Sequence, residues 1–390
     1  MKKKSLSILG VTGSIGQSTA DVVRAHPDKF SVRTVTAQEN VQKLAQMAVA
    51  LGAQTAIIGN PEREQALKTL LEGTKTTVRS GRAALCEAVE PDTDLTVAGM
   101  SGMAGLAPLL SAMAYSKAVA IANKEPLVAA GALVMAQAQK YNCHILPIDS
   151  EHNAVFQVFD FDRPETIARI ILTASGGPFR TWTTGQMAKA TPEQALNHPT
   201  WEMGQKISID SATMMNKALE IIEAHVLFAM PPEKIEVLVH PQSVVHSMVE
   251  YVDGSFLAQM GASDMRTPIA HALGWPDRIA TSGQRLDLKT LQNLTFEAPD
   301  CKKFPALTRA YDCIKAGHMA CLVLNAANEV AVEAFLKNTL DFLGIMRIID
   351  SALAVCPEGA LESLEAVEHM DRIVRQAVRA RLGCGVMVTE

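Results

Sequence analysis

The sequence lacks the long apolar runs that mark membrane-spanning and secreted proteins. No stretch approaches the ~20 apolar residues that a membrane-spanning helix needs. The basic start at residues 2–4 is followed by an apolar run at residues 6–9 that breaks at once into a glycine-rich turn. A signal peptide needs an apolar core of about 7–15 residues, so this start does not qualify. We therefore expect a soluble, cytoplasmic protein that has no membrane partner.

Paired cysteines and excess positive charge are missing too. The seven cysteines form no Cys-x-x-Cys pair, which excludes zinc-ribbon and thioredoxin-type sites and is typical of reduced, mostly buried thiols in the cytosol. The net charge of −5 argues against a broad surface for nucleic acid, although it leaves room for a basic pocket that binds one phosphate. The length of 390 residues, with 48% hydrophobic and 20% charged, predicts a globular chain of two or three domains.

The first 150 residues alternate short apolar strands with helical segments. Strands are predicted over residues 5–9, 31–36, 56–58, 95–97, 117–122 and 144–148, and a helix over residues 18–25. This alternation predicts an α/β fold with a Rossmann-like, doubly wound parallel sheet. We expect a dinucleotide-binding domain that ends near residue 150.

The rest of the chain changes character twice. Strands are predicted over residues 167–173, 236–239, 244–251 and 255–260, with Asp253-Gly254 as a hairpin turn. The stretch of about 176–206 is rich in Thr, Pro, Trp and Gly, which favours a mobile lid loop over a packed element. We therefore expect an α+β catalytic and dimerisation domain over residues 151–275. A linker over 276–305 and a C-terminal helical bundle over 306–390 follow, with amphipathic helices at 323–336 and 365–382.

A glycine motif at residues 10–16 lies directly after the first strand and before the first helix. Glycines there allow a tight turn and the close approach of a pyrophosphate to the helix N-terminus. The spacing is Gly-x-x-Gly-x-x-Gly, so a plain glycine turn is the alternative. Glu39 follows the second strand, where an acid usually binds a ribose 2′-hydroxyl and favours NAD over NADP. It would equally suit the start of a helix, pointing into solvent.

Charged residues follow two later strands of the predicted sheet. Lys124 follows one of them, and Asp149 and Glu151 follow the next. In an extended segment residues i and i+2 share a face, so both carboxylates can converge on Mg²⁺ or Mn²⁺ at the ligand-binding edge of the sheet. The alternative is a helix cap, in which Asp149 or Ser150 binds the first amides of the following helix.

The segment of residues 208–220 combines a strand-like start with a Ser/Thr-capped helix. Asn216, Lys217 and Glu220 fall on one side of that helix. With Ser211 at the helix N-terminus they would make a compact anion site, and Glu220 would offer a third carboxylate to a metal. A capped surface helix carrying a Lys–Glu pair is the alternative.

These residues together resemble one family, the 1-deoxy-D-xylulose 5-phosphate reductoisomerases of the non-mevalonate isoprenoid pathway. The matching segments run in order from residue 6 to about residue 335. They are residues 12–16, 122–125, 146–153, 175–180, 208–220, 240–244, 264–271 and 325–329. The Asp-Ser-Glu-His-Asn block at 149–153 and the block at 210–220 are highly specific. The sequence departs from the family at Gln38-Glu39, where members often carry a Gly and then a basic residue.

The resemblance implies an NADPH- and divalent-metal-dependent rearrangement and reduction that yields 2-C-methyl-D-erythritol 4-phosphate. It places Mg²⁺ or Mn²⁺ on Asp149, Glu151 and Glu220, with Lys124 beside them as a further catalytic residue. The implied substrate residues are Lys124, Ser150, Glu151, Ser175, His198, Trp201, Ser211, Asn216, Lys217 and Glu220, with Trp201 and Met203 in the lid. The implied cofactor residues are Thr12, Gly13, Ser14, Ile15, Asn40, Asn123, Glu125 and Gly204. The family is homodimeric and ends in a helical bundle.

Two other classes of function compete with this one. A metal-independent NAD(P) dehydrogenase of a sugar or aldehyde would also use the glycine motif and residues 123–126, so loss of activity with a chelator discriminates between them. A non-enzymatic, dinucleotide-sensing regulator would need a DNA-binding module, and neither the charge nor any motif offers one.

Overall fold

The computed structural model describes residues 3–201 and 203–383. Residue 202 of the predicted lid and residues 384–390 of the predicted helical domain lie outside that range. The chain forms two compact units, which are described separately below. Unit 1 is Met1–Pro126, Val134–Gln157 and Asp264–Leu286, and unit 2 is Leu127–Leu133, Val158–Ser263 and Asp287–Glu390. The predicted domain boundaries near residues 150, 275 and 305 stay predictions.

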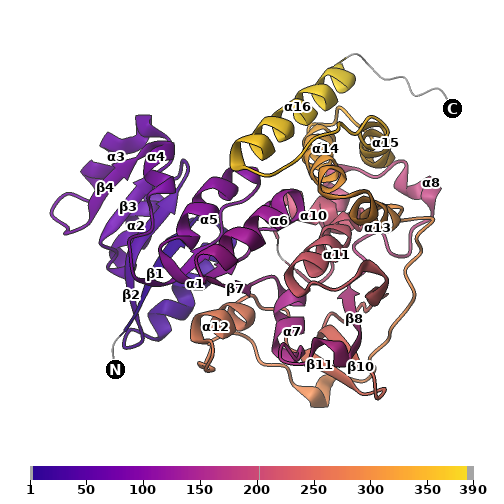
Figure 1. Ribbon diagram of the computed structural model, residues 1–390, viewed down its shortest axis with the longest axis horizontal. Coiled ribbons are helices and arrows are strands. Elements are labelled where there is room, and N and C mark those ends of the chain that lie inside the picture. Colours follow the sequence, from indigo (N-terminus) through magenta and orange to yellow (C-terminus); the bar gives the residue numbers. More distant parts are fainter. Residues whose placement is uncertain (1–2, 202, 384–390) are drawn as a thin grey trace. The chain divides into compact units, whose positions relative to one another are not determined.

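Unit 1 is built on a seven-stranded sheet in the order β4-β3-β2-β1-β5-β6-β7, drawn in indigo to purple in Figure 1. Its strands are β1 Lys4–Leu9, β2 Phe30–Ala37, β3 Thr55–Ile58, β4 Thr77–Ser80, β5 Thr93–Ala98, β6 Ser116–Ile121 and β7 His144–Pro147. All pairs are parallel, which confirms the predicted doubly wound sheet. Strand β4 escaped prediction because it is short and none of its residues is buried. The strand order reverses between β1 and β5, the place where such sheets bind ligands.

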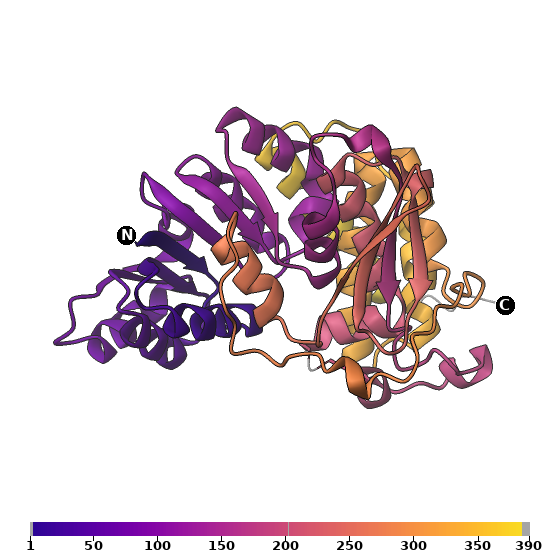
Figure 2. The same cartoon turned by 90° about the horizontal axis from the view of Figure 1, so that it is seen from below.

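Helices follow most strands of this sheet. They are α1 Ser14–Ala25, α2 Val41–Leu51, α3 Glu64–Leu70, α4 Gly81–Cys86, α5 Leu106–Met113, α6 Glu125–Lys140, α7 Ser150–Val158 and α12 Arg266–Gly274, with short 3₁₀ turns η1 Pro61–Arg63 and η2 Met103–Gly105. Helix α12 comes from much later in the chain and packs beside α1, as both ribbon views show (Figures 1 and 2). The sequence pattern did not predict α12.

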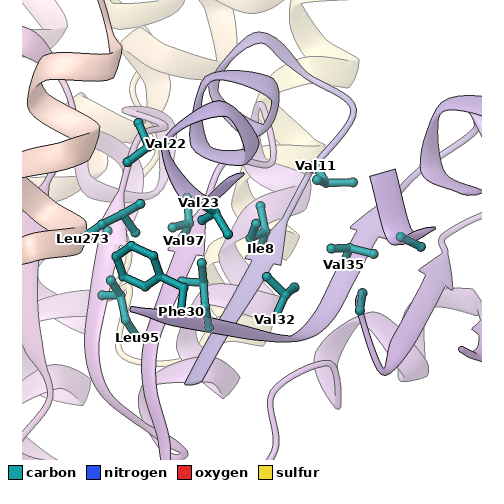
Figure 3. Close-up of a cluster of buried hydrophobic side chains, with 14 of the residues drawn as sticks. Ile8, Val11, Val22, Val23, Phe30, Val32, Val35, Leu95, Val97 and Leu273 are labelled. Atoms are coloured by element: carbon teal, nitrogen blue, oxygen red, sulfur yellow. The ribbon is translucent and has the colours of Figure 1, made fainter. Parts of the chain in front are cut away.

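The core of unit 1 lies between these helices and the sheet (Figure 3). Ile8 and Val97 of adjacent strands are fully buried, and Val22 of α1 and Leu273 of α12 complete the same cluster. Burying such side chains stabilises a fold by about 1.5–3 kcal/mol each. The loops that follow β1, β6 and β7 therefore extend from a well-packed sheet.

Unit 2 contains a four-stranded sheet in the order β11-β10-β8-β9. Its strands are β8 Ile167–Ala174, β9 Ile235–Val239, β10 Val245–Tyr251 and β11 Phe256–Met260. Strands β10 and β11 form the predicted antiparallel hairpin, and Gly254 takes the left-handed conformation that its turn requires. The predicted α+β character of this region is confirmed.

Helices supply the rest of unit 2, with the C-terminal ones drawn in orange to yellow in Figure 2. They are α8 Thr184–Met187, α9 Pro192–Leu196, α10 Gln205–Ala212, α11 Met215–Phe228, α13 Ala306–Ala316, α14 His318–Leu336, α15 Phe342–Leu353 and α16 Leu364–Gly383, with 3₁₀ turns η3 Pro164–Thr166, η4 Pro232–Lys234 and η5 Leu288–Thr290. The predicted C-terminal helical region is confirmed. Helix α14 is long and apolar enough to cross a membrane, but 78% of its apolar window is buried inside the protein, as in a core helix.

Two expectations about unit 2 are wrong. The stretch 176–206 is not free of packed elements, because α8 and α9 each begin with a complete capping box, at Thr183 and Thr191. The start of the 208–220 segment is helical rather than strand-like, since Ser208 and Ile209 lie inside α10. Ser211 consequently lies near the C-terminal end of α10 and not at a helix N-terminus. Short apolar runs of this kind do not distinguish strand from helix.

The half-buried ring of His271 makes the stability of unit 1 depend on pH. Burial, helped by the charge of Arg278, lowers the pKa of His271 to about 4. Its Nδ1 lies 3.1 Å from Nδ2 of Asn153. The folded protein thus binds this proton less well than the unfolded chain does, so the stability is present above the unfolded pKa of 6.5 and is lost as the pH falls toward 4.

We expect the free energy of unfolding to fall by about 2 kcal/mol between pH 7.5 and pH 5 because of His271. His271→Gln should flatten this slope, whereas His318→Gln, at an exposed position, should not. Urea unfolding at several pH values measures both. Equal slopes in wild type and His271→Gln would contradict the prediction.

Candidate functional site

The glycine motif forms a tight turn between β1 and α1. Gly10 has a φ of +87°, and a Cβ there would lie 2.6 Å from the carbonyl oxygen of Gly99. A Cβ on Gly16 would lie 2.4 Å from the carbonyl oxygen of Gly10, so both positions require glycine. Gly13 caps α1 without any side-chain hydrogen bond, and Ser14 beside it is exposed. Thr12 and Ile15 are half-buried on either side. The first amides of α1 are therefore open to a pyrophosphate.

The residues after β2 are held by local hydrogen bonds. The side chain of Asn40 accepts a hydrogen bond from the Lys43 amide at 3.0 Å and caps α2. Glu39 is well exposed, but it does not simply point into solvent: its Oε2 accepts a hydrogen bond from Nδ2 of Asn60 at 3.0 Å. Asn40 thus has a structural task of its own at the place where the resemblance puts the cofactor.

Lys124 lies after β6, at the ligand-binding edge of the sheet, as predicted. It is only 6% exposed, and its ammonium forms an ion pair with Asp149, which follows β7. Glu125 in the first turn of α6 is also buried. The adjacent Asn123 has a buried Nδ2 with no hydrogen-bond partner in the described part of the chain. That amide is a donor available to a bound molecule.

Asp149 is both a helix cap and a charged group. Its Oδ1 accepts hydrogen bonds from the amides of Glu151 at 3.1 Å and His152 at 3.3 Å. The prediction that residues 149–151 are extended is therefore wrong, because Ser150 and Glu151 already belong to α7. Burial by itself would raise the pKa of the Asp149 carboxyl, but the charges of Lys124 and His152 hold that pKa well below its usual range. Asp149 is thus an anion and remains a suitable ligand for a cation.

In unit 2, His198 connects the two ends of the predicted lid. Its Nε2 lies 3.0 Å from Oγ of Ser175, which follows β8. Its Nδ1 accepts a hydrogen bond from the Trp201 amide at 3.0 Å, so in the neutral ring Nε2 carries the proton and donates to Ser175. The half-buried Trp201 ring lies 6.2 Å from the ring of His246. Half-buried Met203 and exposed Gly204 then lead into α10.

The glycine loop after β8 lies against the end of α10. A Cβ on Gly177, whose φ is +67°, would lie 2.4 Å from the carbonyl oxygen of Ser211. The Gly177 amide donates to Oγ of Ser175 at 3.2 Å. The structure therefore brings the loop that carries Ser175 against the end of α10 that carries Ser211, and neither serine lies at a helix N-terminus.

Helix α11 carries a buried ion pair. Met214 takes a left-handed conformation with a φ of +59° and turns the chain from α10 into α11. Lys217 is 3% exposed and Glu220 is fully buried, and they form an ion pair. Asn216 also donates to the Glu220 carboxylate through Nδ2, while its buried Oδ1 has no partner among the described residues. The predicted cluster of these three side chains is present.

One supporting contact was not predicted. The carboxylate of Asp210, next to Ser211, is buried and accepts hydrogen bonds from Nδ2 of Asn328 and Nζ of Lys206, both at 2.8 Å. Asn328 lies on α14, so the C-terminal helices hold the end of α10. The signal in the sequence is the Asn-Ala-Ala-Asn-Glu segment at 325–329, which contributes to the family resemblance but does not by itself indicate a contact with Asp210.

These groups fit a dinucleotide, a divalent cation and a phosphate. A pyrophosphate suits the glycine turn, which has no room for a Cβ, and the open amides at the start of α1. Carboxylates such as Asp149 are the hard oxygen ligands that Mg²⁺ and Mn²⁺ prefer. Hydroxyls of Ser175 and Ser211 with the ammonium of Lys217 suit a phosphate.

Comparison with known proteins identifies a family. Three sequence profiles match: 1-deoxy-D-xylulose 5-phosphate reductoisomerase over residues 6–131, its C-terminal domain over 145–228, and the DXP reductoisomerase C-terminal domain over 260–377. The enzyme of this name from Rhodospirillum centenum is 50% identical, with 98% of this chain and 95% of that protein covered. The one from Cupriavidus pinatubonensis is 50% identical over 97% of each chain.

Comparison with solved structures identifies the same family. The Zymomonas mobilis enzyme in complex with NADPH is 47% identical, with a TM-score of 0.93 over 98% of this chain and 99% of that one. A DOX-P reductoisomerase in complex with NADPH, fosmidomycin and magnesium is 42% identical, with a TM-score of 0.94 over 97% and 98% of the two chains. A metal-independent dehydrogenase is therefore not favoured. The chain belongs to the 1-deoxy-D-xylulose 5-phosphate reductoisomerase family.

Proposed function

We propose that Asp149, Glu151 and Glu220 hold the divalent metal with which this reductoisomerase converts 1-deoxy-D-xylulose 5-phosphate to 2-C-methyl-D-erythritol 4-phosphate. NADPH and a divalent metal are its cofactors. The observation that carries the assignment is the pairing of two of these carboxylates with buried lysines: Asp149 forms an ion pair with Lys124, and Glu220 with Lys217. Each carboxylate can therefore bind a metal ion in place of the lysine ammonium.

When bound, the metal supplies a Lewis acid for the substrate carbonyl and hydroxyl, and NADPH supplies the hydride. The residues of this chain supply binding and charge. Lys124 would offset negative charge that develops on the substrate oxygens, and Ser150 and Glu151, in the first turn of α7, would contact the sugar. Ser175, Ser211, Asn216 and Lys217 form the phosphate subsite. Lys217 can then donate to the phosphate instead of to Glu220, which frees Glu220 for the metal.

We also propose the cofactor residues that the resemblance implies. Thr12, Gly13, Ser14 and Ile15 surround the open start of α1, where the pyrophosphate would lie. The Nδ2 of Asn123, which has no hydrogen-bond partner among the described residues, would supply a donor at the sheet edge. Asn40 and Gly204 complete the proposed set.

The direct test of the function is NADPH oxidation, followed by its absorbance with 1-deoxy-D-xylulose 5-phosphate as substrate. We expect turnover with Mg²⁺ or Mn²⁺ and none after treatment with a chelator. Substitution of any one proposed metal ligand by its amide, as in Glu220→Gln, should lower kcat by at least about 100-fold because the substrate is no longer polarised. Glu233→Gln, at an exposed position after α11, is the control and should retain full activity.

Turnover that survives chelation would remove the metal from the reaction. A Glu220→Gln variant with normal kcat would instead leave the reaction in place and remove only Glu220 from the metal site. Glu220 would then be no more than the partner of Lys217.

We also propose that the loop at 176–206 closes over bound substrate with Trp201 as its cover. His198 supports this, because it ties Trp201 to the candidate phosphate residue Ser175. Phosphate binding at Ser175 would thus act on the loop through His198. A closed loop excludes water from the reacting carbon chain.

Trp201→Ala should lower kcat and raise KM, each by about tenfold, since closure forms fully only around the reacting substrate. Trp201 fluorescence should change when fosmidomycin is added, and Trp201→Phe should abolish the change. Trp182→Phe is the matched control, because Trp182 packs on Phe179 with ring centroids 4.4 Å apart. A full response in Trp201→Phe would exclude the covering role.

Finally, we propose that the protein is a cytoplasmic homodimer that pairs through β11. This strand is the edge of its sheet, and it exposes Phe256, Leu257 and Met260 by 48%, 49% and 38%. An apolar edge strand is a template for a second strand, and a two-fold axis lets two copies pair identically. The cytoplasmic location is supported by free thiols, since the buried Cys143 and Cys321 form no disulfide with any described residue.

Sedimentation should give twice the chain mass of 41.9 kDa for the wild type. Leu257→Asp should shift the mass toward that of one chain, because a charge would be buried at the interface. Val355→Asp, at another exposed apolar position outside the sheet, should leave the dimer intact. A Leu257→Asp protein that remains dimeric would place the interface elsewhere.

A further inference from the structure

The end of β2 carries an acid where an NADPH enzyme would gain from a base. A carboxylate at this position usually binds the 2′-hydroxyl of NAD and repels the 2′-phosphate of NADPH. Glu39 occupies it here, and Gln38 and Asn40 beside it are uncharged. The cation that neutralises the 2′-phosphate must therefore come from another segment.

The loop after β3 supplies such a cation. Arg63, in η1 after β3, places its Nε 3.8 Å from Oε2 of Glu39. Asn60 at the start of the same turn donates through Nδ2 to that oxygen at 3.0 Å. The Oδ1 of Asn60 accepts a hydrogen bond from the Glu62 amide at 3.0 Å, so the orientation of the Asn60 amide is fixed. Glu39 is thereby drawn toward the β3 loop.

The sheet fixes this meeting of the two loops. Strands β2 and β3 are in parallel register up to the pair Ala37 and Ile58. Beyond the strands, the Asn60 amide still donates to the Gln38 carbonyl oxygen at 3.0 Å. A Cβ on Gly59 would lie 2.1 Å from Oε1 of Gln38, so the Gln38 side chain lies across Gly59. Neither loop can move far from the other.

Arg63 has hydrogen-bonding capacity to spare. Its side chain is 58% exposed, and in the described part of the chain Glu39 is the one carboxylate within ion-pair distance. A guanidinium presents a planar fork that binds a phosphate through two parallel hydrogen bonds. A dianionic phosphate at this place would compete with the single, longer contact to Glu39.

We propose that Arg63 binds the 2′-phosphate of NADPH and makes this chain specific for it, with Asn60 holding the Glu39 carboxylate aside. The inference rests on the dinucleotide site proposed above, since the adenosine ribose must reach the end of β2. The residue that selects NADPH over NADH would thus lie in the loop after β3 rather than in the loop after β2.

The test is equilibrium binding of NADPH and NADH to the full chain without substrate, followed by the fluorescence of the nicotinamide. The wild type should bind NADPH more tightly than NADH. Arg63→Ala should weaken NADPH by about 10- to 100-fold, the effect of losing a charge-assisted pair, and change NADH by less than about twofold. Arg63→Lys should recover part of the NADPH affinity, because it restores the charge without the fork.

Lys68→Ala is the matched control, because Lys68 is an exposed cation on the neighbouring helix α3 that pairs with Glu64 at 2.6 Å. It should leave both affinities unchanged. If Arg63→Ala leaves the ratio of NADPH to NADH affinity unchanged, Arg63 is not the specificity residue even though the dinucleotide site stands. If the wild type binds neither dinucleotide, the proposed site itself fails and the inference fails with it.

Discussion

The proposed chemistry depends on two ion pairs between a buried lysine and a carboxylate, Lys124 with Asp149 in unit 1 and Lys217 with Glu220 in unit 2. A buried charge is tolerated only when an opposite charge and hydrogen bonds compensate for the water it has lost. The lysines therefore let the carboxylates stay ionised without a metal, and the carboxylates let the lysines stay ionised without a substrate. Ligands can then replace partners that are already charged.

Each pair depends on backbone geometry around it. The first is set by the sheet, since Lys124 and Asp149 follow the neighbouring parallel strands β6 and β7. The second depends on the turn at Met214, which starts α11 so that Asn216 and Lys217 both reach Glu220. Glycines act where no side chain fits, as at Gly177 against Ser211. The backbone thus holds each buried polar group next to its partner, which is why the fold can accommodate these groups.

The sequence predicted these features to different degrees. The parallel sheet was predictable because its strands are apolar and alternate with helices, as in residues 5–9 followed by α1. The Lys217–Glu220 pair was predictable because residues three apart lie on one face of a helix. The cap at Asp149, the helical state of Ser208 and the contact of Asn328 with Asp210 were not, since each depends on packing between segments far apart in the chain. Arg63 beside Glu39 belongs to the same class.

The central claim is that Asp149, Glu151 and Glu220 hold the divalent metal. The most direct test is the binding of Mn²⁺ to the protein without NADPH or substrate, followed by the electron paramagnetic resonance of free Mn²⁺. We expect one bound Mn²⁺ per chain in the wild type and in Lys217→Met, because without substrate this lysine only balances the charge of Glu220. We expect affinity that is weaker by at least about tenfold in Glu220→Gln. Equal Mn²⁺ affinity in Glu220→Gln and wild type, or loss of Mn²⁺ binding in Lys217→Met alone, would contradict the claim.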